Sequence, residues 1–140
     1  MLLQIIDSKP IDDAGDVLRA AARLIRAFGS HERQSYFSCF SVDATFVFYT
    51  HARRLENLAE YESLWHEWET RDKFRILACV SSEQAVTIRG ATAIFTHAVT
   101  TRVSTSGGTE RLAERETIIF EKRDGNWLAV HEHLSPFSAT

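Results

Sequence analysis

The chain has 140 residues, of which 44% are apolar and 25% charged, and its formal net charge is −3 at pH 7. This length and composition are those of one ordinary globular domain, and we expect a single domain over residues 1–140. The negative charge offers no basic excess for binding phosphates, which disfavours nucleic acid as a partner. Cys39 and Cys79 lack the spacing of a metal site and are interpreted as free thiols in a reducing compartment.

The start of the chain, residues 1–6, is apolar but short. It lacks the basic leader of a secretion signal and is far shorter than a membrane span. We interpret it as an arm or first strand that packs on the body. We therefore expect a cytoplasmic protein with no membrane partner.

Two helices are expected next. The first begins near Asp12 or Asp13, either of which can cap free backbone N–H groups, and it ends at Gly29. Apolar residues recur at helical spacing between these limits and form one stripe. Ser30 can then cap a short second helix.

A short aromatic strand, residues 45–49, precedes a third helix. Asn57 can cap this helix, and Glu60 stands three residues on, as in a capping box. Trp65 and Trp68 belong to its inward-facing stripe. They are predicted to be core residues or an apolar wall of a cavity.

The chain after Lys73 has the alternation of β-strands. Strands are expected at about 74–80 and 84–89, with a turn between them, and then at about 91–104 and 109–123. A final strand follows. Helices at the front of an antiparallel meander indicate an α+β domain, with the helices laid across one face of a curved sheet.

A tight turn at Asp124-Gly125 joins the last two strands. Asp-Gly between alternating apolar runs is a strong hairpin signal, because both residues tolerate the positive φ of a type I′ turn. In the strand after it, alternation puts Trp127, His131 and His133 on one face. Two imidazoles on one face suggest a polar-lined cavity.

A two-residue turn also predicts the cross-strand pairs. His131 should lie opposite Ile118, and His133 opposite Glu116. A His133–Glu116 hydrogen bond would fix the imidazole tautomer and suit acid–base chemistry. The alternative is a structural polar pair at the end of the sheet or a dimer contact, because structural pairs also perturb pKa values.

This order of elements, with the segment 40–46 and a distinctive final hairpin, resembles the NTF2-like superfamily of SnoaL-like and ketosteroid-isomerase-like proteins. The hairpin reads Glu116-Thr117, then Arg123-Asp124-Gly125-Asn126-Trp127, then His131-x-His133-x-Ser135. It looks closest to the association domain of calcium/calmodulin-dependent protein kinase II. The resemblance implies an NTF2-like cone with three N-terminal helices packed on a curved antiparallel sheet. It also implies a cavity between the helices and the concave face, and a homodimer formed through the opposite face.

The catalytic residues of the isomerase do not carry over. Its general-base position falls on Phe48, and its oxyanion-binding tyrosine falls on Leu24. Neither side chain can move a proton or donate to an enolate oxygen. A pocket arginine common in the kinase-type hairpin is replaced by Ile118.

The candidate cavity residues are therefore Tyr49, His51, Trp65, His97, Glu116, His131 and His133, and no catalytic residue is assigned. For each, a structural role is the alternative, since a lone histidine on an apolar strand face or in a loop is commonly not a ligand. The sequence has no GxGxxG, P-loop, HExxH or GxSxG motif, so no cofactor and no metal is expected.

Two functions remain open. One is a dimeric binding or assembly module with a histidine-lined hydrophobic cavity for a small hydrophobic or aromatic molecule. The other is a SnoaL- or isomerase-type enzyme in which a cavity histidine with Glu116 acts as acid and base on a small hydrophobic substrate. Fold alone does not choose between them.

Overall fold

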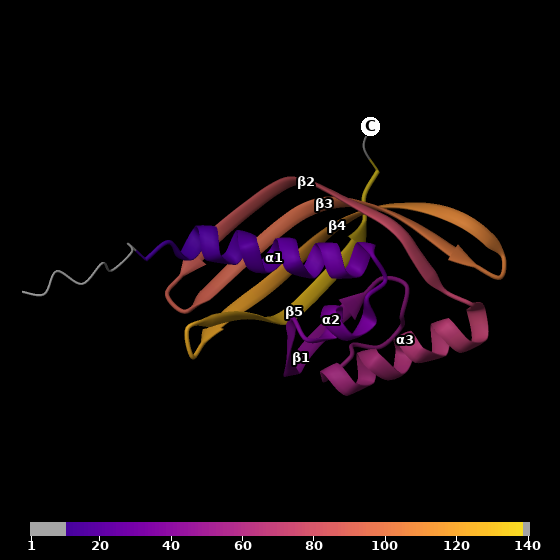
Figure 1. Ribbon diagram of the computed structural model, residues 1–140, viewed down its shortest axis with the longest axis horizontal. Coiled ribbons are helices and arrows are strands. Elements are labelled where there is room, and N and C mark those ends of the chain that lie inside the picture. Colours follow the sequence, from indigo (N-terminus) through magenta and orange to yellow (C-terminus); the bar gives the residue numbers. More distant parts are fainter. Residues whose placement is uncertain (1–10, 139–140) are drawn as a thin grey trace, which may run out of the picture.

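The computed structural model describes residues 11–138 (Figure 1). The arm predicted for residues 1–6 lies outside them. The elements in chain order are α1 (Asp13–Gly29), α2 (Arg33–Phe37), β1 (Phe40–Phe48), α3 (Leu58–Asp72), β2 (Arg75–Arg89), β3 (Thr92–Thr105), β4 (Gly108–Arg123) and β5 (Asn126–Pro136). Three helices on a five-stranded curved sheet confirm the predicted α+β cone.

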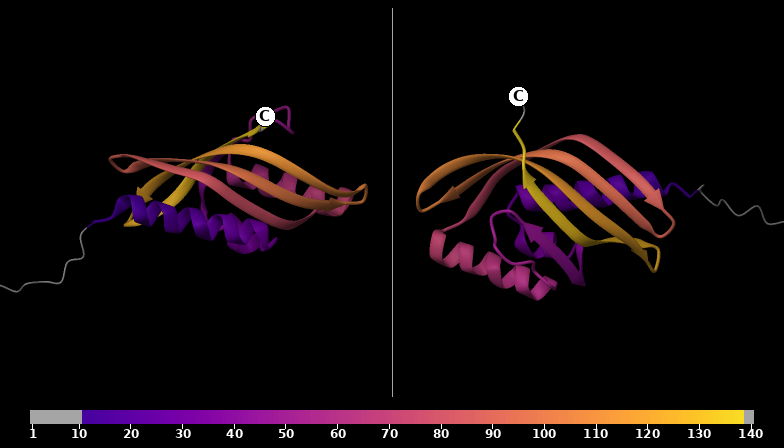
Figure 2. Two further views of the ribbon diagram at one scale, coloured as in Figure 1. Left: turned by 90° about the horizontal axis from the view of Figure 1, so that it is seen from above. Right: turned by 180° about the vertical axis from the view of Figure 1, so that it is seen from behind.

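The strand order across the sheet is β1-β5-β4-β3-β2. Strands β2 to β5 form an antiparallel meander, as predicted. The β1–β5 pair is parallel instead, and it joins β1, which precedes α3, to the last strand of the meander. In Figures 1 and 2, the sheet curves over α1.

Local sequence signals set the helix ends. Asp12 accepts a hydrogen bond from the Gly15 N–H at 3.0 Å, and Asn57 accepts one from the Glu60 N–H at 2.9 Å, so both predicted caps are confirmed. The prediction that Ser30 caps α2 is wrong. Ser30 instead closes α1, since its N–H bonds the Arg26 carbonyl at 3.0 Å.

Strand β2 is one continuous element where the sequence predicted two strands and a turn. The pairing with β3 shifts between Ser82 and Ala85, and Glu83 has a φ of 53°. The polar stretch therefore forms a β-bulge, in which an edge strand bends without ending.

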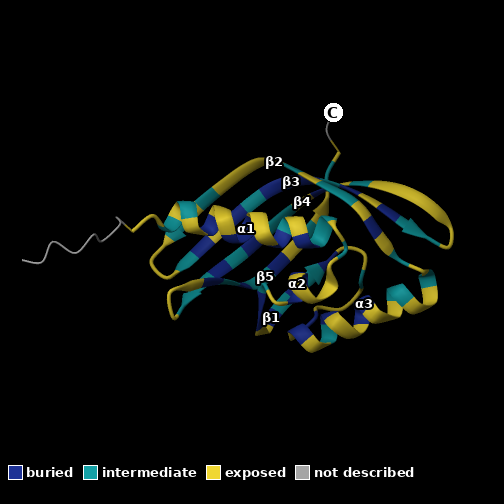
Figure 3. Cartoon of the chain, in the orientation of Figure 1, coloured by how far each residue is buried: buried dark blue, intermediate teal, exposed yellow. Residues whose placement is uncertain are grey.

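The core lies between the helices and the concave face (Figure 3). Alanine and small aliphatic residues on α1 face the sheet, which allows close packing. An aromatic cluster fills the space between α2 and α3, and its members Tyr36, Phe37, Tyr61 and Trp65 have ring centroids 5.1 to 6.1 Å apart. Trp65 is 0% exposed, so it is both a core residue and part of the cavity wall described below.

Candidate ligand cavity

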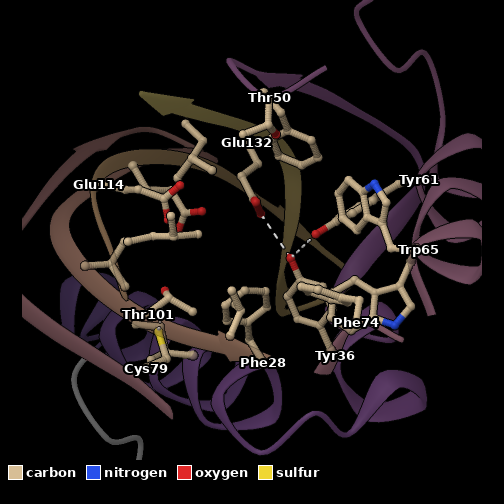
Figure 4. A pocket seen from close by; sticks show the side chains of 18 of the residues that line it. Phe28, Tyr36, Thr50, Tyr61, Trp65, Phe74, Cys79, Thr101, Glu114 and Glu132 are labelled. Carbon is tan, nitrogen blue, oxygen red and sulfur yellow. Dashed lines mark hydrogen bonds between the residues drawn. The ribbon is translucent and has the colours of Figure 1, made fainter. Parts of the chain in front are cut away.

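A cavity of about 270 Å³ lies between the helices and the concave face of the sheet (Figure 4). One part of its wall is aromatic and comes mainly from the helices: Phe28, Tyr36, Phe48, Tyr61, Trp65, Trp68 and Phe74. Another part comes from β3, β4 and β5 and contains His97, Glu114, Glu116 and Glu132. The cavity thus has an aromatic end and an acidic end.

The acidic end depends on a bulge in the final hairpin. Near the turn, Trp127 pairs with Lys122 and Ala129 with Phe120, as predicted. Asp124 and Gly125 have φ of 52° and 79°, as the predicted type I′ turn requires.

Beyond that point the predicted register is wrong. The pairing shifts between Ile119 and Phe120, so that β5 has one extra residue, Val130. His133 pairs with Thr117 instead of Glu116, and Glu132 pairs with Ile118. An extra residue reverses the alternation of side chains after it, so Glu132 is buried and His133 is exposed.

Glu116 pairs with a different histidine. The Nε2 atom of His97 lies 2.8 Å from Oε1 of Glu116, and its Nδ1 atom lies 2.7 Å from Oγ of Ser81. The amide of Gln84 donates to the same Ser81 oxygen at 2.9 Å. With the proton on Nε2, His97 donates to Glu116 and accepts from the Ser81 hydroxyl at Nδ1.

Glu132 connects this pair to the aromatic end. The Tyr36 hydroxyl donates to Oε2 of Glu132 at 3.5 Å, and the hydroxyls of Tyr36 and Tyr61 hydrogen-bond each other at 2.9 Å. Burial, and next the charge of nearby Glu116, raise the pKa of Glu132 well above its ordinary value. Burial also raises the pKa of both tyrosines, so they remain protonated at neutral pH.

Glu114 is the third carboxyl group of the acidic end. It accepts a hydrogen bond from the Tyr49 hydroxyl at 2.6 Å. Burial raises the pKa of Glu114, and burial followed by the Glu114 contact raises the pKa of Tyr49. Tyr49 does not line the cavity itself, but its hydrogen bond holds Glu114, which does.

The sequence candidates therefore separate into two groups. Trp65, His97 and Glu116 lie on the cavity wall. His51 lies beside a shallow surface groove near the start of α3.

His131 and His133 lie on the outer face of the sheet. Nδ1 of His131 is 2.8 Å from the Thr45 hydroxyl, and the two imidazole centroids are 6.3 Å apart. Burial, and then the positive charge of Arg54, lower the pKa of His131. The predicted position of these histidines inside the cavity is wrong because of the bulge at Val130.

Sequence reasoning placed Tyr61 beside Trp65 and Trp68 in a cavity wall, as the structure has it, but it missed Tyr36, Glu114 and Glu132 as cavity residues. Glu114 was accessible in principle, because it stands two residues before Glu116 on one strand and therefore shares its face. Glu132 was not, because simple alternation from Trp127 places it on the other face.

Over residues 11–138, which the structure describes, no three His, Cys, Asp or Glu side chains are placed to hold a metal ion. Cys39 and Cys79 are free thiols. Burial raises the pKa of Cys79 to about 12, so this thiol on the cavity wall is protonated and unreactive at neutral pH. Among the helices over the same residues, none is long and apolar enough to cross a membrane.

Comparison with known families fits this architecture. Residues 17–139 match the SnoaL-like domain family. The chain belongs to this family. The predicted resemblance to SnoaL-like proteins is thereby confirmed.

Solved structures show the same fold at low sequence identity. A protein described as a calcium/calmodulin-dependent kinase II association domain from Exiguobacterium sibiricum has a TM-score of 0.76 and 14% identity, over 95% of this chain and 99% of its own. The CaMKII hub of S. rosetta has a TM-score of 0.72 and 21% identity, over 92% and 100%. An NTF2-like protein from Cytophaga hutchinsonii has a TM-score of 0.76 and 14% identity, over 91% and 100%. A search of curated proteins gave no match.

Proposed function

We propose that this protein is a small-molecule-binding module and that its ligand occupies the cavity between the helices and the concave face. The single observation that carries the proposal is an aromatic-walled cavity into which a few polar groups converge. Ligand sites commonly combine a mostly apolar wall with a small number of placed polar groups.

The size of the cavity limits the ligand. A volume of about 270 Å³ is at the lower limit of the range, roughly 300–1,000 Å³, that is typical for drug-sized ligands. We therefore expect a small hydrophobic or aromatic molecule with one polar group. Trp65, Tyr61 and Tyr36 would contact its apolar part, and Glu116 and Glu132 its polar part.

The binding module is also proposed to be a homodimer that associates through the outer face of the sheet. Val80 on β2 is 64% exposed and Ile94 on β3 is 37% exposed, which leaves apolar surface there. Several structural neighbours are named as association or hub domains. Analytical ultracentrifugation of Ile94→Lys should give a monomer where the wild type gives a dimer; an unchanged sedimentation coefficient would contradict this part of the proposal.

Binding is tested with small aromatic probes by isothermal titration calorimetry. The wild type should bind at least one of phenethylamine, 2-phenylethanol and phenylacetate with a stoichiometry of one per chain. Val99→Phe, on a buried position of the cavity wall, should abolish that binding. Val42→Phe, on an 81% exposed position, is the matched control and should bind as the wild type does.

The outcome that would overturn the binding proposal is a folded wild type that binds none of the probes. Circular dichroism establishes that Val99→Phe is folded, because overpacking a core position costs about 1–3 kcal/mol.

A second candidate function is acid–base catalysis, and the His97–Glu116 pair favours it. The pair sits on the cavity wall with its tautomer fixed by Ser81, and Glu132 supplies a protonated carboxyl group nearby. A base beside a bound carbonyl compound would accelerate exchange of its α-protons. Proton NMR of acetophenone in D₂O tests this: the wild type should exchange the methyl protons faster than Glu116→Gln, and equal rates would remove catalysis of this type.

A further inference from the structure

We infer that the ligand of this cavity carries a primary or secondary ammonium group, bound at the acidic end, on an aromatic or aliphatic body held at the aromatic end. The inference rests on the proposed binding function above and specifies its ligand class. It is carried by three observations: the charge of the cavity wall, the unused hydrogen-bond acceptors, and the aromatic side chains beside them.

The charge of the wall excludes an anionic ligand. Its ionisable acidic residues are Asp72, Glu114, Glu116 and Glu132, and no lysine or arginine is among the residues that line it. Its single histidine, His97, already has both ring nitrogens in hydrogen bonds. A carboxylate or phosphate would enter a cavity whose wall carries acidic side chains and no lysine or arginine to pair with it, and whose only imidazole is occupied.

The acidic end has more hydrogen-bond acceptors than donors. Glu132 is 3% exposed; its Oε2 atom accepts from Tyr36 over a long 3.5 Å, and its carboxyl group is also within hydrogen-bond reach of the Glu116 carboxyl group. Glu114 is 6% exposed, and only its Oε2 atom has a donor, the Tyr49 hydroxyl.

Both carboxyl groups face the cavity in Figure 4. When ionised, a carboxylate has about four acceptor sites, which is more than the single donors Tyr36 and Tyr49 can fill.

A neutral ligand with only acceptor atoms fits this end less well. The hydroxyls of Tyr36 and Tyr61 are already bonded to Glu132 and to each other, and the proton that Glu132 holds has the Glu116 carboxyl group as an acceptor close by. An ammonium group instead supplies up to three donors and a positive charge. It therefore supplies both things that the acidic end lacks, which are hydrogen-bond donors and a positive charge.

The aromatic walls support the same ligand class. The rings of Tyr36 and Tyr61 carry the hydroxyls that lead to Glu132, so they lie where the acidic and aromatic ends meet (Figure 4). A cation near the face of an aromatic ring is stabilised when it is desolvated. The same rings would also cover an apolar body attached to the ammonium group.

Binding should release a proton. The titratable groups that face Glu132 are Tyr36 on α2, Tyr61 on α3, and Glu114 and Glu116 on β4, with His97 on β3 bonded to Glu116. None of them supplies a fixed positive charge. An ammonium ion would supply one and favour ionised Glu132, whose proton then leaves to the solvent.

The experiment compares three probes with the same phenyl-ethyl or phenyl-methyl body and different head groups: phenethylamine, 2-phenylethanol and phenylacetate. Calorimetry at pH 7 should show phenethylamine binding about tenfold or more tightly than 2-phenylethanol, the difference expected for one charge-assisted hydrogen bond, and no measurable binding of phenylacetate. Repeating the amine titration in two buffers of different ionisation enthalpy should reveal proton release.

Glu132→Gln removes the charge and keeps the size of the side chain. It should weaken phenethylamine about tenfold and abolish the proton release, while the affinity for 2-phenylethanol changes little. Glu121→Gln is the control, because Glu121 lies on the same strand as Glu114 and Glu116 and is not a cavity residue. It should bind all probes as the wild type does.

The outcomes separate the two proposals. If 2-phenylethanol or phenylacetate binds as tightly as phenethylamine, the ammonium inference is wrong and the binding function stands. Loss of amine binding in Glu121→Gln equal to that in Glu132→Gln would also overturn the inference. If no probe binds the folded wild type, both proposals fail.

Discussion

Strand β5 presents different chemistry on its two faces. On the inner face, Glu132 is 3% exposed and faces a cavity. On the outer face, His131 contacts Thr45, and its neighbour His133 is exposed. Because one extra residue, Val130, separates this end of the strand from its turn, a carboxyl group occupies the cavity and the two imidazoles do not. A single bulge thus decides which functional group faces the ligand site.

The largest expected effect is on the inner side of this comparison. Trp65→Ala should lower the free energy of unfolding by about 3–5 kcal/mol, because it removes a fully buried ring from the aromatic cluster. Urea denaturation measures the change. Trp68→Ala, at a half-buried position on the same helix, is the control and should cost clearly less; equal losses would contradict the assignment of Trp65 to the core.

The histidine of the inner face should matter more than those of the outer face. His97→Ala should lower the free energy of unfolding by about 1–3 kcal/mol, because His97 is 2% exposed and its loss leaves Ser81 and Glu116 without their partner. Urea denaturation at pH 7 measures this. If His97→Ala lowered the free energy of unfolding by less than His133→Ala does, the inner-face histidine would not be the more important one.

The inner face should also determine how stability depends on pH. Burial, with Glu116 next, raises the pKa of Glu132 well above 4.5, so the folded protein keeps a proton that the unfolded chain has lost. The contribution of Glu132 to the free energy of unfolding is therefore fully present below about pH 4.5. It is lost as the pH rises through the folded-state pKa, by at most about 1.4 kcal/mol per pH unit.

Glu132→Gln isolates this contribution. Its free energy of unfolding should rise relative to that of the wild type as the pH increases above 4.5, the ordinary pKa of the glutamate that it lacks. His131 lies on the outer face and is present in both proteins, so its own shift cancels in the difference, whereas Glu114 and Glu116 interact with Glu132 and the difference reports these three carboxyl groups together. Urea denaturation across the pH range measures it, and parallel profiles for the two proteins would show that Glu132 does not hold the proton.

The smallest effect is expected on the outer face. His133→Ala should change the free energy of unfolding by no more than about 0.5 kcal/mol, because the side chain is exposed. It should also leave the affinity for phenethylamine unchanged. A tenfold weaker binding in calorimetry would place the ligand on the outer face and would break the comparison.

Features of this chain that depend on neighbouring residues could be predicted from its sequence. The Asp12 and Asn57 caps and the Asp124-Gly125 turn involve contacts over a few residues, and all three were predicted correctly. The overall fold followed from the order of these local elements and from the likeness of the final hairpin to a known family.

Features that depend on tertiary packing could not be predicted in the same way. No glycine marks the bulge at Val130. Its effect is visible only in the folded structure, where Glu132 faces inward and contacts Tyr36. The parallel pairing of β1 with β5 joins segments more than 80 residues apart. The sequence also did not show that His97 lies opposite Glu116, because that contact follows from the register of β3 and β4.

The most direct test of the account is a crystal structure of the protein with phenethylamine. We predict that the ammonium nitrogen lies about 3 Å from a carboxyl oxygen of Glu132 or Glu114, with the phenyl ring against Tyr36 and Tyr61. Phenethylamine bound at His131 and His133, or a cavity closed by side chains and empty at saturating amine, would contradict it.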